Sequence, residues 1–255
     1  PQGVSSKAPS LSVKYKREER YYGGSFAIAN HISSFVKAVQ LCTNNKVELS
    51  HGPLASNISI KHSPIGVDVV EKIRYISEEN GQRLLEVTKI DENAWGSFSP
   101  EDKKVFLNKI FHNNTDDLML LCDFGHGFFD DEVIRESAWF MGHLALNCQT
   151  NSSNFGFNPF TKFTKFDYLS IDLREARIAY HNKNLNSDDL FLRASGDYPN
   201  CAISMTLGQA GAYFAQGAGI VFRAPAFADQ VVDTIGAGDA YYAITSLLNV
   251  VKAPP

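Results

Sequence analysis

Apolar residues recur at helical spacing soon after a pair of glycines near the N-terminus. Between Ser25 and Gln40 they stand at every third or fourth position, which predicts a helix over 25–40. Residues 11–22, ahead of the glycines, predict an extended segment. Residues 69–76 and 83–90 predict two strands around an Asn-Gly pair, which is a strong hairpin signal. We therefore expect the chain before residue 91 to form a small β subdomain.

From residue 99 onward, helical periods alternate with short apolar runs. Ser99-Pro100-Glu101-Asp102 is typical of a helix start, with Ser as N-cap and Pro at the first helical position. The pattern predicts strands at 117–122, 143–148, 168–171, 201–207, 212–216 and 220–223, and helices at 130–140, 173–180 and 238–251. Strands that alternate with helices indicate an α/β fold whose mostly parallel sheet is covered on both faces.

Four glycine-marked or acidic segments follow predicted strands. They are residues 123–127, 172–175, 207–211 and 233–239. In an open α/β sheet, ligands bind at the carboxyl ends of the strands. We therefore expect the functional site where these four segments meet, within one domain over residues 1–255.

Composition excludes several classes of function. The chain of 255 residues has a net charge of −4 and no basic stripe that would suit a nucleic acid. No apolar run reaches the roughly 18–20 residues that span a bilayer, and the first residues lack the pattern of a signal peptide. The four cysteines are scattered, which predicts free thiols in the reducing cytoplasm. The spacing of the seven histidines does not favour a zinc site, and no P-loop motif is present.

The segment Asp233-Thr234-Ile235-Gly236-Ala237-Gly238-Asp239 carries the most specific chemistry. Glycines at a strand-to-helix junction let successive N–H groups point at one spot, and the helix N-terminus adds to this anion hole. A carboxylate at Asp239 is placed to accept a proton from a hydroxyl that approaches the hole. This pairing suits phosphoryl transfer. The alternative is a helix start with turning glycines and a capping Asp.

These seven residues resemble the C-terminal signature of the ribokinase-like (PfkB) carbohydrate kinases. Three further segments match that family in order: the glycine pair Gly23-Gly24, Asp172-Leu173-Arg174-Glu175 for the N-x-x-E element, and Thr206–Gly211 for the T-x-G-x-x-G segment. The resemblance implies a three-layer α/β/α fold with a mostly parallel sheet. It also implies a small β lid, drawn from about 8–22 and 69–90.

The resemblance implies ATP-dependent phosphoryl transfer to a hydroxyl of a sugar or sugar phosphate. Asp239 would be the base, and the amides of Gly236, Ala237 and Gly238 would stabilise the transferred group. The remaining roles implied are nucleotide binding by Thr206, Gly208, Gly211, Asp233 and Thr234, sugar binding by Gly23, Gly24 and Arg74, and magnesium binding by Glu175 and Asp172. For Arg74 the alternative is a solvated strand arginine. The polar loop Gln149–Ser152 is a further candidate for contact with the nucleotide.

Within the family, the chain is most similar to the heptose-phosphate kinases of ADP-heptose synthesis. That similarity lies in residues 8–10, 72–75, 82–87 and 121–127. It implies heptose 7-phosphate as substrate, and a fused or partner nucleotidylyltransferase, whose H-x-G-H signature this chain lacks. Homodimers that pair through the lids are common in the family. Compared with the family pattern, we expect the chain to be incomplete at both ends.

Three residues depart from the family pattern. Ala27 and Asp172 stand where the family usually has Asn, and His126 stands where heptose kinases carry Lys. Hard cations prefer oxygen ligands, so Asp172 can still serve a hydrated magnesium ion. These departures leave two alternatives open: a nucleotide- or sugar-binding module without turnover, and a kinase for ribose, fructose phosphate or a nucleoside.

Overall fold

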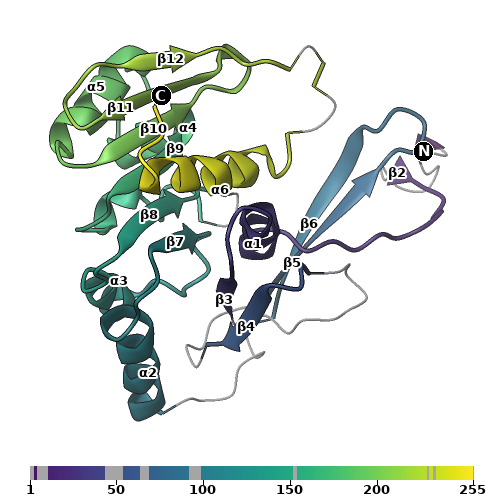
Figure 1. The fold of residues 1–255 in the computed structure, drawn as a ribbon. Helices are drawn as coiled ribbons and strands as arrows, with labels where there is room; N and C mark the ends of the chain where they lie inside the picture. Colours follow the sequence, from purple (N-terminus) through teal and green to yellow (C-terminus); the bar gives the residue numbers. More distant parts are fainter. Residues whose placement is uncertain are drawn as a thin grey trace.

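The computed structural model describes residues 3–4, 11–43, 54–63, 69–91, 99–151, 154–228, 230–231 and 234–254. Helices pack on both sides of one central sheet, and a long hairpin projects away from it (Figure 1). No helix in these ranges is long and apolar enough to cross a membrane.

The elements follow one another in the order strand, helix, strand through most of the second half of the chain. The helices are α1 Ser25–Ser33, α2 Pro100–Leu107, α3 Asp131–Ser137, α4 Leu173–Ala179, α5 Ser187–Asp197 and α6 Ala237–Val250, with short helical turns at Asn108–His112, Phe160–Lys162 and Gly208–Ala210. The strands are β1 Gly3–Val4, β2 Leu11–Ser12, β3 Val39–Thr43, β4 Ile58–His62, β5 Val69–Ile76, β6 Arg83–Asp91, β7 Leu118–Asp123, β8 His143–Cys148, β9 Tyr168–Asp172, β10 Ala202–Thr206, β11 Ala212–Gln216 and β12 Phe222–Ala224.

The central sheet has six strands in the order β12-β11-β10-β9-β8-β7. Strands β7 to β10 are parallel, and β11 and β12 continue the sheet in antiparallel fashion. The register sets Asp123 beside Cys148, and Asp172 beside Thr206. The carboxyl ends of the parallel strands therefore share one edge, as the sequence predicted.

Side chains alternate between the two faces of the sheet, and each face has its own apolar cluster. Leu144 and Leu146 of β8 belong to the larger cluster, which α2, α3, α4 and α5 cover. Ala145, between them, belongs to the smaller cluster, which α1 and α6 cover with residues such as Phe26 and Tyr242. Because β8, β9 and β10 are buried on both faces, they consist mostly of apolar residues, which made them easy to predict.

The predicted start of α2 is confirmed. The Ser99 side chain accepts a hydrogen bond from the Asp102 N–H at 3.1 Å, and the Asp102 carboxylate accepts from the Ser99 N–H. Pro100 occupies the first helical position, where its missing N–H leaves no bond unmade.

The predicted helix over 25–40 is wrong beyond Ser33. Helix α1 ends there, and Val39–Thr43 forms β3, whose side chains alternate between buried and less buried. The Asn57 side chain donates to Ser33 O at 2.8 Å and to Val36 O at 3.1 Å, so a distant residue satisfies carbonyls at the helix end. Such a cap is invisible to local periodicity.

The β material before residue 91 divides into two parts. Strands β5 and β6 form the predicted antiparallel hairpin, with Arg74 opposite Glu86. Strands β3 and β4 instead form a parallel pair whose residues pack on α1 in the smaller cluster. The extended segment predicted at 11–22 contains only β2 as a strand, since residues 13–22 have no regular structure.

Candidate active site

The N-terminus of α6 presents its backbone at the shared sheet edge. Gly236 is the N-cap with φ of 78°, a left-handed conformation that favours glycine. A Cβ added at Gly236 or Gly238 would meet no atom within 4 Å, so an anion can approach this backbone. The Ala237 N–H already donates to Thr234 O at 3.1 Å. Of the three amides predicted to face a phosphoryl group, that of Ala237 is therefore engaged within the turn.

Asp239 lies in the first turn of α6, half-buried. Its Oδ1 accepts a hydrogen bond from Gln149 Nε2 at 2.8 Å. Burial raises the pKa of the Asp239 carboxyl, whereas the Gln149 hydrogen bond and the charges of His31 and Lys72 oppose that rise. A carboxylate with a raised pKa is a stronger base than an exposed aspartate.

An open cleft of about 3150 Å³ runs between the hairpin and the sheet edge. Its lining includes Gly23, Gly24, Arg74, His126 and Asp239. The structure thus places the predicted sugar-binding residues and the predicted base around one cleft. Ala27, also on its lining, is half-buried in α1.

Positive side chains approach the cleft from the hairpin. Arg74 Nε lies 2.7 Å from Glu86 Oε2 on the facing strand, so its charge is partly neutralised by a neighbour. Lys72, two residues earlier on β5, also lines the cleft, and its positive charge lowers the pKa of the Asp239 carboxyl. Lys72 was not among the predicted site residues, although the period of two in a strand sets it on the same face as Arg74.

Asp172 and Glu175 form a capping box at the start of α4. The Glu175 N–H donates to Asp172 Oδ1 at 2.6 Å, and the Asp172 N–H donates to Glu175 Oε2 at 2.9 Å. The other Glu175 oxygen accepts from the Thr150 N–H at 3.2 Å. Burial, with the nearby Asp172 carboxylate, raises the pKa of Glu175 to about 8.

These two carboxyl groups suit a magnesium ion that keeps most of its waters better than an ion coordinated by protein side chains alone. Both oxygens of Glu175 already accept backbone hydrogen bonds, whereas the exposed Asp172 accepts one, at Oδ1, within the described part of the chain. Among the described residues, no group of three or more His, Cys, Asp or Glu side chains could hold a metal ion. Mg²⁺ usually keeps several waters and takes one or two carboxylates together with substrate phosphates.

The predicted nucleotide segment lies at the end of β10. Thr206 is beside Asp172 in the sheet register, and Gly208 opens a short helical turn that ends at Gly211. None of these three residues lines the cleft described above. This segment and the cleft therefore occupy different parts of the sheet edge. Two predicted nucleotide ligands remain. Thr234 is exposed just ahead of α6, and Asp233 lies outside the described residues.

We expect Gly211→Ala to lower the free energy of unfolding by about 2–5 kcal/mol. Gly211 has φ of 92°, and a Cβ there would lie 2.0 Å from the Ala224 carbonyl oxygen. Gly208→Ala is the matched control: φ is 60°, but no atom lies within 4 Å of its Cβ, so a cost of about 1 kcal/mol is expected. Urea unfolding of both variants measures the difference, and equal costs would contradict the close contact.

Part of the chain matches a known protein family. A family model described as pfkB family carbohydrate kinase matches residues 163–245, which hold the capping box, the β10 segment and the start of α6. No curated protein matches the chain.

Solved structures extend the likeness over most of the chain. A point mutant of phosphofructokinase-2 from Escherichia coli superposes with a TM-score of 0.65 at 11% identity, over 91% of this chain and 76% of that one. A putative ribokinase from Agrobacterium tumefaciens gives a TM-score of 0.61 at 14% identity, over 97% and 80%. The adenosine kinase from Sinorhizobium meliloti gives 0.58 at 17%, over 90% and 71%. The chain therefore has the ribokinase-like fold, and its residues 163–245 match the pfkB carbohydrate kinase family.

Proposed function

We propose that this chain is an ATP-dependent kinase that phosphorylates a hydroxyl of a sugar or sugar phosphate. The observation that carries the proposal is the half-buried Asp239 carboxylate in the first turn of α6. It stands beside accessible helix N-terminal backbone and on the lining of the cleft. A base and an anion hole at one point are what transfer of a phosphoryl group to a hydroxyl requires.

In the proposed reaction Asp239 accepts the proton of the attacking hydroxyl. The amides of Gly236 and Gly238, with that of Ala237 completing the turn, face the negative charge on the transferred group. Gly23, Gly24 and Arg74 contact the sugar in the cleft. Each role follows from position and from the resemblance to the family.

ATP would bind along the sheet edge between the β10 segment and the start of α6. Thr206, Gly208 and Gly211 would shape this pocket, together with Thr234 and Asp233. Asp172 and Glu175 would hold a hydrated Mg²⁺ near the phosphates. When bound, the ion neutralises phosphate charge.

The finer proposal is a phosphorylated sugar such as heptose 7-phosphate, as the resemblance to heptose-phosphate kinases implies. Lys72 and Arg74 on the cleft favour an anionic substrate. The alternatives are ribose, fructose phosphate or a nucleoside. Competition between phosphorylated and unphosphorylated sugars tests the choice: the phosphorylated members should inhibit labelled transfer more strongly, and equal inhibition would exclude an anion-binding cleft.

A second candidate is a nucleotide- or sugar-binding module without turnover. Ala27, Asp172 and His126 favour it, because each departs from the family pattern at a place near substrates. Parallel measurements of ATP binding and of phosphate transfer separate the two candidates. Binding with transfer identifies a kinase, and binding without transfer to any sugar identifies the module.

Assembly and location belong to the same proposal. Apolar side chains are exposed on the hairpin, among them Tyr75, Ile76 and Leu85, and a homodimer that pairs through these lids would cover them. A fused or partner nucleotidylyltransferase would use the phosphorylated product in ADP-heptose synthesis. All four cysteines are free thiols, which suits the cytoplasm.

A further inference from the structure

Hydrogen bonds to Asn147 and Asp239 fix the side-chain amide of Gln149. Asn147 Nδ2 donates to Ser170 O at 2.8 Å, and because a carbonyl only accepts, Asn147 must turn its Oδ1 toward Gln149. Gln149 Nε2 donates to that oxygen at 2.9 Å and to Asp239 Oδ1 at 2.8 Å. Both N–H groups of the amide are thereby used, and its orientation is determined by the backbone of β9.

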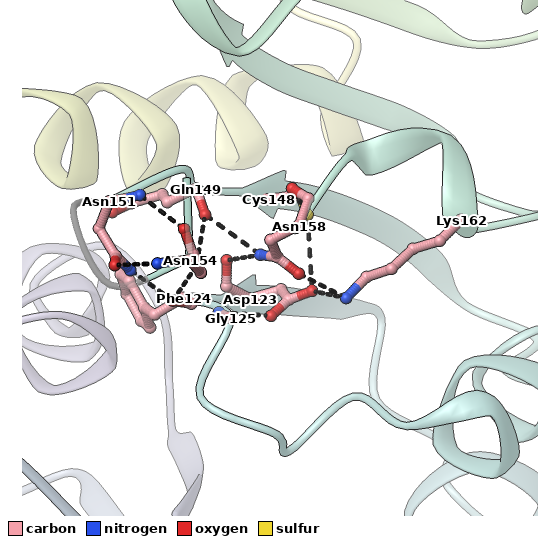
Figure 2. Close-up of polar contacts among 9 residues, drawn as sticks. All are labelled: Asp123, Phe124, Gly125, Cys148, Gln149, Asn151, Asn154, Asn158 and Lys162. Carbon is pink, nitrogen blue, oxygen red and sulfur yellow. Dashed lines mark hydrogen bonds and ion pairs between the residues drawn. The ribbon is translucent and has the colours of Figure 1, made fainter. Parts of the chain in front are cut away.

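The backbone of Gln149 is held by two buried asparagines. Asn158 Nδ2 donates to Gln149 O at 3.1 Å, and Asn154 Nδ2 donates to it at 3.4 Å (Figure 2). Asn154 Nδ2 also donates to Phe124 O at 2.9 Å. The loop after β8 is therefore tied to the loop after β7.

An ion pair between the half-buried Lys162 and the buried Asp123 supports Asn158. Lys162 Nζ lies 2.6 Å from Asp123 Oδ2 and donates to Asn158 Oδ1 at 2.6 Å (Figure 2). Asp123 is only 3% exposed and also accepts from the Gly125 N–H at 2.8 Å. The position of Gln149 thus depends on a rigid network and not on the conformation of a solvated loop.

We propose that Gln149 is a positioning residue for the proposed kinase reaction. Its side chain holds the Asp239 carboxylate so that Oδ2 faces the substrate hydroxyl. Among the described residues, Gln149 is the side chain that donates to Asp239, and its bond occupies Oδ1. Gln149 and Asp239 both line the cleft. The substrate hydroxyl gives its proton to Oδ2 while the hydroxyl oxygen bonds to the γ-phosphorus of ATP. The bond between that phosphorus and the ADP leaving group breaks in the same step. This inference rests on the proposed function for its kinetic consequence, but not for its geometry.

The same hydrogen bond influences when Asp239 is ionised. Burial raises the pKa of the carboxyl, and the Gln149 bond opposes that rise. The other groups that act on Asp239 are His31 of α1 and Lys72 of β5, and Cys122 of β7 is also within electrostatic reach. Burial raises the pKa of the Cys122 thiol, so it stays neutral. Removal of the Gln149 amide should therefore shift the acidic limb of the kcat profile to higher pH.

The test compares Gln149→Leu and Gln149→Glu with the control variant Gln216→Leu. Gln216 is an exposed glutamine at the opposite edge of the sheet. We expect Gln149→Leu to lower kcat by about 10- to 100-fold, the value of a hydrogen bond to a charged group, with little change in the KM for ATP. The acidic limb should move upward in Gln149→Leu and further in Gln149→Glu, where a second carboxylate faces Asp239. Thermal unfolding shows whether each variant is folded. A folded Gln149→Leu with the rate and pH profile of Gln216→Leu would overturn the proposal.

Two further measurements separate this inference from the proposed function. If Gln149 acts only through Asp239, adding Gln149→Leu to Asp239→Asn should change kcat by no more than about twofold. If the two residues act independently, the losses in kcat of the two single variants should multiply. The pKa of the Asp239 carboxyl, followed by carbon NMR, should be higher in Gln149→Leu than in the parent protein. This second readout needs no turnover: an unchanged pKa overturns the inference even if the protein is not a kinase, and a raised pKa supports it.

Discussion

Asp239→Asn is expected to lower kcat by about 10²–10⁴-fold, the contribution of a positioned general base. The Asn side chain has nearly the same shape, and its oxygen can still accept the hydrogen bond that Gln149 donates to Asp239 at 2.8 Å. It cannot, however, take a proton from the substrate. The loss should therefore appear in kcat, with the KM values for ATP and sugar little changed.

The measurement is steady-state phosphate transfer across a range of pH. Asp197→Asn is a suitable control, because that aspartate is exposed at the end of α5 and outside the cleft. The control should keep the parent rate. A folded Asp239→Asn protein with near-normal turnover would show that another group accepts the proton.

Lys162→Met is expected to lower the free energy of unfolding by about 3–5 kcal/mol, the usual cost of leaving a buried charge without its partner. The Asp123 carboxylate is only 3% exposed and would lose the ammonium 2.6 Å away. Its remaining partners are the Gly125 N–H and the Cys148 thiol. Because Lys162 also supports Asn158, the loop that carries Gln149 should loosen as well.

Urea unfolding measures this loss of stability, and it is compared with that of a control variant and of a double variant. Lys183→Met removes an exposed lysine and should change stability by no more than about 0.5 kcal/mol. Asp123→Asn combined with Lys162→Met removes both charges and should recover part of the loss, since no unpaired charge remains buried. If Lys162→Met is as stable as Lys183→Met, the ion pair does not hold this network.

The central sheet could be predicted because its inner strands are buried on both faces. The runs 143–148 and 212–216 form β8 and β11 with the predicted bounds, since a continuous apolar segment between turn signals has few other solutions. The start of α6 was found within one residue, because glycines ahead of a helical period identify such a junction. Local signals of this kind predicted where Asp239 would lie.

Contacts between distant residues could not be predicted. The Gln149–Asp239 hydrogen bond joins residues 90 positions apart, and the Asn57 cap that ends α1 comes from a segment beyond β3. Helix α5 was missed because its apolar residues are few, although Asn186 ahead of two aspartates is a typical N-cap signal. Sequence patterns thus located the central strands and the start of α6, while tertiary contacts determined where elements end and what they position.

Magnesium-dependent release of ADP from ATP, measured with a panel of sugars that includes heptose 7-phosphate, decides whether the chain is a sugar kinase. We expect release that requires both the metal ion and one class of sugar, with that sugar recovered as its phosphate. Clear binding of ATP without release of ADP, for every sugar in the panel, would exclude a kinase and favour a binding module instead.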